Sequence, residues 1–539
     1  MEKKKKFKKI SILVFLILLS SYISSGFFVN SIFYYHSSKS FMSYIVYIII
    51  ILTSLCMVLF TYKGFKTIKK NKTKSYVIYF ILITLFIALE LFISININKI
   101  SNSLSKITNK EKGYSTSLIV LSNSTLNSNN LDDSTIGIIN DENNIEGYTL
   151  ALEIAKELNI DEDNLARYDD FIEMLDALYN EEIDAMFVSS SYVSMFATTQ
   201  GYENIANETK VIYEKSKKEE SKKTSTSKTL TEPFTILIMG VDSDSDSLSN
   251  SNSFNGDTLM LITFNPNTMN ATILSIPRDT KVPIVCTKWK SQNKINSSAY
   301  YGADCVMDTI TNFTGIEIDY WVKVNFQGVI SLVNALDGIE VDVPYAFCES
   351  DSQRRFGKYT VYVEKGLQTL NGEQALAFAR NRHTWPQFCS RKYSNYNSND
   401  FIRGQNQQAI VNAMVNKLKN IKSLNEIYKL LDILGENVDT NIDKDTMITG
   451  FDTFKNILFN SKNITSDDFV GTQKLYLSGY DNYINGIYYF EYYKQSLNEI
   501  VEAMEINLEL KEPIMDKEFE FSINNPYESK QIGKGTYKY

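Results

Sequence analysis

The chain has 539 residues, 44% of them hydrophobic, and a formal net charge of -8. A chain of this length is too long for one compact core, so two or more folded units are expected. The acidic balance excludes a general nucleic-acid binder, because such proteins carry a surplus of lysine and arginine. The placement of the basic residues along the chain is more informative than their number.

Three apolar runs lie near the N-terminus, at about residues 10–33, 41–62 and 76–97. Each is close to the roughly 20 residues that a helix needs to span a membrane. Lysines cluster before the first run and between the second and third, so the positive-inside bias places both segments in the cytoplasm. A cleaved signal peptide is disfavoured because no small-x-small cleavage site is evident. We therefore expect three spans within residues 1–98, and an extracellular region after them.

The cysteines agree with that topology. Cys56 lies inside the second run, and the other four all fall in the expected extracellular region, where disulfides form: Cys286, Cys305, Cys348 and Cys389. Sequence alone allows three connectivities. The pairs Cys286–Cys305 and Cys348–Cys389 are favoured because each brackets a polar, loop-like stretch. A structural zinc site is not expected, because the chain has no CxxC pair.

After a polar stalk at residues 99–116, residues 117–213 read as a small α/β unit with a parallel sheet, because strand and helix patterns alternate. The segment "LYNEEIDA" at residues 178–185 resembles one lobe of periplasmic solute-binding proteins. A ligand cleft needs two lobes, so a spacer or partner-docking module is the favoured interpretation. Residues 214–232 are charged and poor in apolar side chains, which is typical of a flexible linker.

A second domain is expected at residues 233–511. It opens with the strand "FTILIMGVD" and a hairpin whose two apolar runs are joined by Asn-Pro-Asn-Thr. Helical patterns follow at residues 297–313, 326–336, 372–380 and 401–419, and Asp400 is placed to cap the last. The stretch after about residue 423 reads as helix-rich with aromatic core clusters, and residues 512–539 as a disordered polar tail.

The chemistry-bearing residues are acids and arginines. The chain has only two histidines, His36 and His383, and neither a P-loop nor a dinucleotide fingerprint, which argues against a Ser-His-Asp hydrolase or a His-rich metal centre. Several acids and arginines fall at the ends of strands and helices, and strand ends and helix starts are where open α/β sheets place ligands. They are Asp242, Asp257, Arg278, Asp279, Arg380, Arg382, Asp400 and Arg403. Arginine suits phosphate because its planar fork donates two parallel bonds, although an isolated surface arginine is usually only a solvated charge.

From Phe234 to about Lys419 the sequence resembles the LytR-CpsA-Psr domain of bacterial cell-wall glycopolymer transferases. The matching segments occur in family order: "ILIMGVD", "GDTLMLITFNPNT", "LSIPRDT", "KINSSAYYG", "IDYWVKVNFQGV", "LVNALDGIEVDVP", "LNGEQALAFARNR" and "NDFIRGQNQQ". The resemblance implies an α/β/α sandwich. It also implies a cleft that holds the pyrophosphate of a polyprenyl-pyrophosphate glycan together with a divalent cation.

The same resemblance implies roles for individual residues. Asp242 and Asp257 match the metal-facing acids and would hold Mg²⁺. The residues matching the pyrophosphate-binding set are Arg278, Arg380, Arg382, Arg403 and Gln407. Arg403 and Gln407 are four residues apart and so share one helix face, whereas Arg380 and Arg382 would diverge on an ideal helix.

The chain departs from the family pattern in three places. Many members have arginine where Asn255 and Asn406 stand, which makes this site less cationic. An inserted stretch at residues 383–399 carries Cys389 and is interpreted as a lid or rim.

The implied reaction is phosphotransfer of a glycopolymer, such as teichoic acid or capsule, to peptidoglycan. Arg278 would act on the transferred phosphate, and Asp279 or Asp400 would be the general base. One alternative is a phosphatase or pyrophosphatase that uses the same site with water as acceptor. Another is a non-enzymatic sensor that binds a ligand in the unit at residues 117–213, or a transcriptional regulator. Contact with DNA is disfavoured because the cytoplasmic segments are too short for a binding fold.

Overall fold

The chain forms two compact units, Met1–Lys106 with Asp443–Asn456, and Ile107–Ile442 with Ile457–Tyr539. The structure, a computed structural model, describes residues 2–35, 43–70, 72–108, 112–196, 199, 201–219, 230–241, 248, 251–394, 399–418, 421, 423–450, 470–484, 486–512, 532–535 and 537. His36 and Asp242, both considered from the sequence, lie outside these residues.

The first unit contains three long apolar helices, α1 (Glu2–Tyr35), α2 (Ser43–Lys70) and α3 (Thr73–Thr108). Each contains a stretch that is long and apolar enough to cross a membrane. Val14, Tyr79 and Ile83 form a small shared core, whereas large apolar side chains such as Phe15 and Leu59 are exposed, as lipid contact requires. Helix α3 continues to Thr108, so the first part of the predicted stalk is helical.

Residues 112–219, here called the accessory unit, form a five-stranded sheet in the order β3-β2-β4-β1-β5. Its strands are β1 (Lys112–Leu121), β2 (Ile136–Ile139), β3 (Leu165–Tyr168), β4 (Ala185–Ser189) and β5 (Thr209–Glu219). The prediction of a parallel sheet is wrong for two of its four strand pairs. Strand β2 is parallel to β3 and β4, but β1 is antiparallel to both neighbours. Strands β1 and β5 also extend into the predicted stalk and linker.

The accessory sheet is covered by the helical segments η1 (Ile145–Thr149), α4 (Leu150–Glu157), α5 (Phe171–Tyr179), α6 (Tyr192–Phe196) and α7 (Ile205–Glu208). Two apolar clusters form on this sheet, one under α4 and one under α5 and α6. The predicted helices and strands within residues 136–189 therefore occur where their apolar periodicity indicated.

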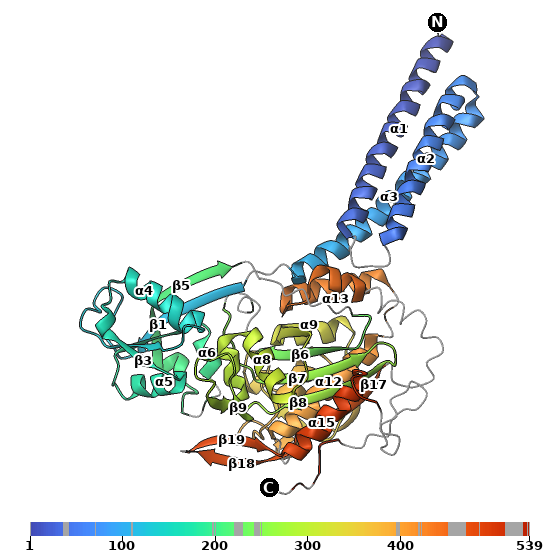
Figure 1. Ribbon diagram of the computed structural model, residues 1–539. Helices are drawn as coiled ribbons and strands as arrows, with labels where there is room; N and C mark the ends of the chain where they lie inside the picture. Colours follow the sequence, from blue (N-terminus) through green and yellow to red (C-terminus); the bar gives the residue numbers. More distant parts are fainter. Residues whose placement is uncertain are drawn as a thin grey trace. The chain divides into compact units, whose positions relative to one another are not determined.

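The second domain is built on a six-stranded sheet in the order β16-β11-β6-β7-β8-β17. Figure 1 shows β6, β7 and β8 side by side within this domain. Its strands are β6 (Phe234–Val241), β7 (Thr258–Asn265), β8 (Asn270–Ile276), β11 (Tyr320–Asn325), β16 (Val438–Thr440) and β17 (Gly471–Tyr476). Strands β7 and β8 pair antiparallel, which confirms the predicted hairpin. Strand β6 pairs antiparallel with β7 and parallel with β11.

Helices cover both faces of this sheet. One face packs with α8 (Ala303–Thr314) and α15 (Lys494–Asn507) around Leu274 and Ile276. Ser275 points to the opposite face because side chains alternate along a strand, and there it meets α12 (Asp400–Leu418). A Cβ at Gly404 of α12 would lie 3.0 Å from the Ser275 Cβ, so glycine lets this helix approach β8 closely. The predicted α/β/α sandwich is therefore present.

A further core joins α12 to α9 (Phe326–Ala335), α10 (Gly372–Arg380) and α13 (Leu424–Asn437). Small strand pairs surround it: β12 (Ile339–Val343) with β15 (Gly366–Leu370), and β13 (Phe347–Glu349) with β14 (Val361–Val363). Strands β9 (Lys281–Pro283) and β10 (Gln292–Lys294) pair before the 3₁₀ segment η4 (Ile295–Tyr301).

The C-terminal part contains helices, as expected, together with strands that were not predicted. After residue 423 the helices α13 and α15 (Lys494–Asn507) are joined by β17 of the central sheet and by the hairpin β18 (Gly479–Ile484)–β19 (Ile487–Tyr492). The predicted disordered tail contains an ordered contact. Ile532 bridges Leu475 of β17, and its side chain is buried.

The structure pairs Cys286 with Cys305, and Cys348 with Cys389. These are the two pairs favoured from the sequence. The first joins the loop after β9 to the start of α8, and the second joins β13 to the stretch at residues 383–399.

Candidate active site

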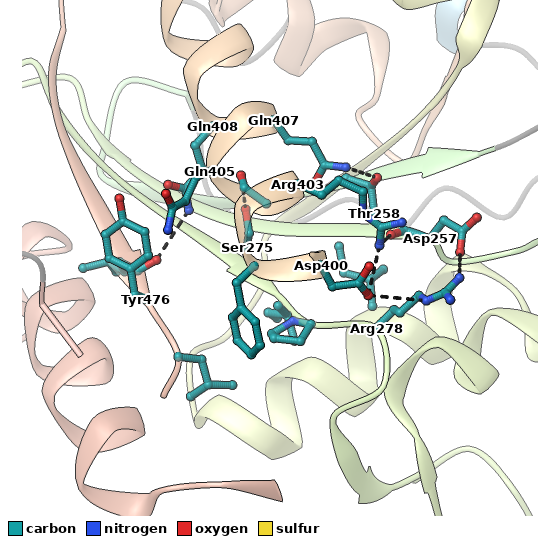
Figure 2. Close-up of a pocket in the computed structure, with 17 residues that line it drawn as sticks. Asp257, Thr258, Ser275, Arg278, Asp400, Arg403, Gln405, Gln407, Gln408 and Tyr476 are labelled. Carbon is teal, nitrogen blue, oxygen red and sulfur yellow. Dashed lines mark hydrogen bonds and ion pairs between the residues drawn. The ribbon is translucent and has the colours of Figure 1, made fainter. Parts of the chain in front are cut away.

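Acids and arginines meet where β7 begins, β8 ends and α12 begins (Figure 2). A narrow pocket there is lined by Asp257, Arg278, Asp400, Arg403 and Gln407, among others. A larger cavity of ≈ 280 Å³ adjoins it and shares four lining residues with it, Pro277, Arg278, Asp400 and Phe401. Its other lining residues are Asp279, Arg382, His383, Asn399, Tyr488 and Phe490.

Arg278 is the centre of the acidic contacts. Its Nη1 lies 2.6 Å from Asp257 Oδ1, and its Nε lies 3.5 Å from Asp279 Oδ2 and 3.6 Å from Asp400 Oδ2. The Arg278 side chain is only 11% exposed. The residue directly follows β8 and Pro277, so the end of the central sheet sets its position. The structure therefore brings Arg278 and Asp257, which the resemblance implied, together with Asp279 and Asp400, the two candidates for the general base.

Asp400 has a different role from the predicted helix cap. Asn399 Oδ1 accepts the Ile402 N–H at 3.0 Å and caps α12 instead. The Asp400 carboxylate faces Arg403 at 3.5 Å and Arg382 at 3.9 Å, besides Arg278. Burial raises the pKa of Asp400, but the three guanidinium groups outweigh burial and hold this pKa below its ordinary value. Asp400 is therefore an ionised acid surrounded by cations.

Arg403 and Gln407 point toward the start of β7, as their shared helix face predicted. Arg403 Nη2 donates to the Asp257 carbonyl at 3.0 Å, and Gln407 Nε2 donates to Thr258 Oγ1 at 2.9 Å (Figure 2). A second Gln407 bond, to the Ala379 carbonyl at 3.2 Å, ties α12 to the end of α10. Both side chains line the narrow pocket.

Arg380 and Arg382 separate. Arg382 lines the larger cavity, where burial, and then Arg278 and Arg403, lower its pKa. Arg380 turns the other way. Its Nη2 donates to the carbonyls of Ser350 and Asp351 at 2.8 and 2.9 Å, and its guanidinium lies 5.1 Å from the Phe326 ring centre. Arg380 lines neither of the two cavities, so the implied set of four arginines is three in this arrangement.

The two asparagines that replace family arginines occupy different environments. Asn406 is buried and donates to the Tyr345 hydroxyl and to the Phe378 carbonyl, away from the cavities. Asn255 is also buried, but its Nδ2 lies 3.2 Å from Asp257 Oδ2. Only the second substitution thus bears directly on the site.

Lys294 is a cation near the site that the sequence prediction did not include. Its Nζ lies 2.7 Å from Asp279 Oδ1 and 5.9 Å from the ring centres of Tyr488 and Tyr489. The available signal for Lys294 was its place in "KINSSAYYG", one of the family-like segments.

The expected rim contributes to the larger cavity. His383 and Asn399, the two ends of the inserted stretch, both line it. Burial and the neighbouring Arg382 lower the pKa of His383, so its imidazole is neutral at pH 7. Trp385 Nε1 donates to Glu349 Oε2 at 3.1 Å and, with the Cys348–Cys389 disulfide, anchors the stretch to β13.

The predicted metal ligands are only half described, because Asp242 lies outside the described residues. Among the residues that the structure does describe, no group of three His, Cys, Asp or Glu side chains could hold a metal ion. Asp257 offers a hard carboxylate on the pocket wall. Gly240, near the end of β6, pairs with Thr258, so the register brings that strand end beside Asp257. This donor chemistry fits Mg²⁺ if phosphate oxygens and water complete the shell.

Comparisons with known proteins identify the family of this domain. Residues 195–506 match the model of the LytR_cpsA_psr family. The chain is 32% identical over 283 residues to the polyisoprenyl-teichoic acid–peptidoglycan teichoic acid transferase TagV of Bacillus subtilis (strain 168), covering 51% of this chain and 65% of TagV. It is 32% identical over 279 residues to TagU, named for the same activity in that strain, covering 52% and 79%. The crystal structure of B. subtilis TagV aligns at 30% identity with a TM-score of 0.41, covering 52% of this chain and 98% of that one.

Proposed function

Because the chain belongs to the LytR_cpsA_psr family, we propose that its second domain transfers a glycopolymer from a polyprenyl-pyrophosphate carrier to peptidoglycan. TagV and TagU, its relatives, are named as transferases that move teichoic acid to peptidoglycan. The lysine asymmetry around the three apolar helices supports a cytoplasmic N-terminus and an extracellular second domain. The membrane helices would hold the enzyme at the surface in which its lipid-linked substrate is embedded.

The observation that carries this proposal is the convergence of three arginines from three separate elements. Arg278 follows β8, Arg382 follows α10, and Arg403 lies in the first turns of α12. All three face Asp400 beside the cavities. Guanidinium groups bind phosphate oxygens through charge-assisted bonds, so a pyrophosphate can take the place of the carboxylate as their partner.

The proposed step is a displacement at phosphorus. A peptidoglycan hydroxyl oxygen bonds to the phosphorus nearest the glycan. The bond from that phosphorus to the bridging oxygen breaks, and polyprenyl phosphate leaves with the electron pair. The arginines offset the negative charge that develops on the phosphate and on the leaving group. The hydroxyl proton passes to a carboxylate, and Asp279 and Asp400 are the candidates because both line the larger cavity.

We further propose that Asp257 and Asp242 hold Mg²⁺. The ion would neutralise charge on phosphate oxygens when bound. Asp257 is held in place by Arg278 Nη1 at one carboxylate oxygen and by Asn255 Nδ2 at the other.

The test uses the full chain reconstituted in vesicles, with a lipid-linked teichoic acid precursor and isolated peptidoglycan. Covalent attachment of the glycan to peptidoglycan is expected. Arg278→Ala and Arg403→Ala should each reduce transfer about tenfold to hundredfold, because each removes charge-assisted bonds of roughly 1.5–3 kcal/mol. The matched control is Arg167→Ala, a surface arginine of the accessory unit that pairs with the exposed Glu162.

The same experiment separates the phosphatase alternative. A phosphatase would release phosphorylated glycan at the same rate with and without peptidoglycan, and would leave the peptidoglycan unmodified. Full transfer activity in the Arg278→Ala/Arg403→Ala double variant would reject the assignment of the site.

A further inference from the structure

The accessory unit contacts the second domain through the carboxyl ends of its parallel strands. This is the edge at which open α/β sheets bind ligands. Asp141, after β2, accepts the Lys288 backbone N–H at 2.8 Å, and Asp170, after β3, accepts from Asn293 Nδ2 at 3.1 Å. At the end of β4, the Ser189 hydroxyl lies 2.8 Å from the Ser251 hydroxyl. The second domain therefore occupies the edge where a separate ligand would otherwise bind.

Tyr300 of η4 strengthens this contact. Its ring packs edge-on against Phe171 and Phe196, with ring centres 5.8 and 5.9 Å apart, and thus joins an apolar cluster of the accessory unit. Burial raises the pKa of the Tyr300 hydroxyl. The contact therefore combines apolar packing with side-chain hydrogen bonds between the two domains.

At the centre of this contact lies Glu146, which is 2% exposed. Its Oε1 accepts the backbone N–H of Ser115 at 2.7 Å and of Asn252 at 3.1 Å, and its Oε2 accepts that of Ser253 at 3.1 Å. The Ser251 hydroxyl donates to the same carboxylate at 2.9 Å. One buried carboxylate of the accessory unit thus binds three successive residues of the second domain.

Those residues lie shortly before Asp257, in the described part of the segment between β6 and β7. Two residues beyond Ser253, Asn255 Nδ2 donates to the Ser194 carbonyl of the accessory unit at 3.0 Å. The same nitrogen lies 3.2 Å from Asp257 Oδ2. Asp257 in turn contacts Arg278 through its carboxylate and Arg403 through its carbonyl. A continuous series of contacts therefore connects Glu146 to two of the three converging arginines.

We propose that Glu146 is a positioning residue for the active site, holding loop 251–257 so that Asp257 orients Arg278 and Arg403; this inference rests on the proposed function. The accessory unit is then a structural part of the transferase and not a separate ligand sensor. The match to the family model begins at residue 195. Glu146, Ser189 and Ser194 all precede it, so the contacts that hold loop 251–257 come from a part of the chain outside the family match. A carboxylate suits this position because it accepts several N–H bonds at once.

The test compares Glu146→Gln with Glu142→Gln in the full chain. Glu142 is exposed and lies in the turn just before η1, the helical segment that carries Glu146, so it is a matched control. In Glu146→Gln one acceptor oxygen becomes an NH₂ group that faces N–H donors. Hydrogen–deuterium exchange of peptides covering residues 251–257 should become faster, and the transfer rate should fall on the order of tenfold. Glu146→Asp keeps the charge and should recover part of both effects.

The outcomes are separable. Unchanged exchange in Glu146→Gln, or faster exchange with an unchanged transfer rate, would overturn the inference. If the unsubstituted chain shows no transfer, the proposed function fails, while the exchange measurement still tests whether Glu146 holds the loop. If Glu146→Gln does not fold, Ser251→Ala removes the loop-side hydroxyl alone. Parent-like exchange and parent-like transfer in that variant would then reject the inference.

Discussion

Asp400 and Glu146 are acids that each gather several donors, but their donors differ in kind. Asp400 faces three guanidinium groups at the wall of an open cavity. Glu146 faces backbone N–H groups and a serine hydroxyl inside a closed contact between two domains. Mobile cationic side chains can exchange one anion for another, whereas backbone dipoles that are fixed in a loop cannot. The first arrangement suits substrate binding and the second suits permanent positioning.

The largest expected effect is on stability. Asp400→Ala leaves three neighbouring guanidinium groups without their shared acid, which should lower the free energy of unfolding by about 3 kcal/mol. Inorganic pyrophosphate should restore part of this loss in a concentration-dependent way, because an anion that binds only the folded state stabilises it. Thermal melting with and without pyrophosphate measures both the loss of stability and its recovery. Glu146→Ala should also be less stable than the parent, but pyrophosphate should not restore its stability. Equal recovery of stability in the two variants would contradict the distinction between Asp400 and Glu146.

The next largest effect concerns substrate affinity. Arg382→Ala should weaken binding of geranylgeranyl pyrophosphate about tenfold or more, because its guanidinium faces the larger cavity. Arg380→Ala should change affinity much less, since Arg380 donates to the carbonyls of Ser350 and Asp351. Titration calorimetry of the two variants side by side is the measurement. An equal loss of affinity in both would show that Arg380 rotates into the site when the ligand binds.

A pH dependence follows from the lowered pKa of Asp400. The pKa in the unfolded chain is about 3.9, and the folded value lies below it. The stabilisation by ionised Asp400 is therefore fully present above about pH 5 and is lost as the pH falls through the folded pKa. Asp400→Asn should be less stable than the parent at pH 7, and the difference should shrink below about pH 4. Denaturant melts across this range test the sign, and a difference that grows in acid would refute it.

The smallest effect is expected at Gln407. Gln407→Ala removes two neutral hydrogen bonds, to Thr258 and to the Ala379 carbonyl, and leaves the arginines in place. A loss of about 1 kcal/mol, equivalent to roughly fivefold in transfer rate, is the expected scale. The steady-state transfer rates of Gln407→Ala and Arg403→Ala, measured side by side, rank these two residues of one helix face by their contribution to transfer. A larger loss for Gln407 than for Arg403 would place the main phosphate contact elsewhere.

Local patterns predicted a large part of the fold. The hairpin β7–β8, helix α10 and the start of α12 all lie within a residue or so of their sequence-based bounds, because turn residues and apolar spacing specify them locally. The accessory sheet was predicted as parallel because strands and helices alternate along its sequence. That alternation does not reveal that the first strand, β1, pairs antiparallel with the last, β5. Strand β17 was missed because its partner β8 lies about two hundred residues earlier in the chain.

The site was predictable to a similar degree. Spacing alone showed that Arg403 and Gln407 share a face, and both line the narrow pocket. Family resemblance supplied Arg278, Asp257 and Arg382, which the structure brings to the same cavities. Resemblance could not show that Arg380 turns toward Ser350, because that orientation depends on a loop between β13 and β14.

By itself, the sequence determined the features that depend on neighbouring residues: the apolar helices with their flanking lysines, the hairpin, and the face of α12. The tertiary structure alone decided which acid accompanies which cation. Asp400 was predicted as a cap, yet Asn399 caps the helix and Asp400 meets arginines from two other elements. Glu146 carried no motif at all, and its role arises because the fold places it against a loop more than a hundred residues later in the chain. Contacts of that range are set by packing, which sequence periodicity does not encode.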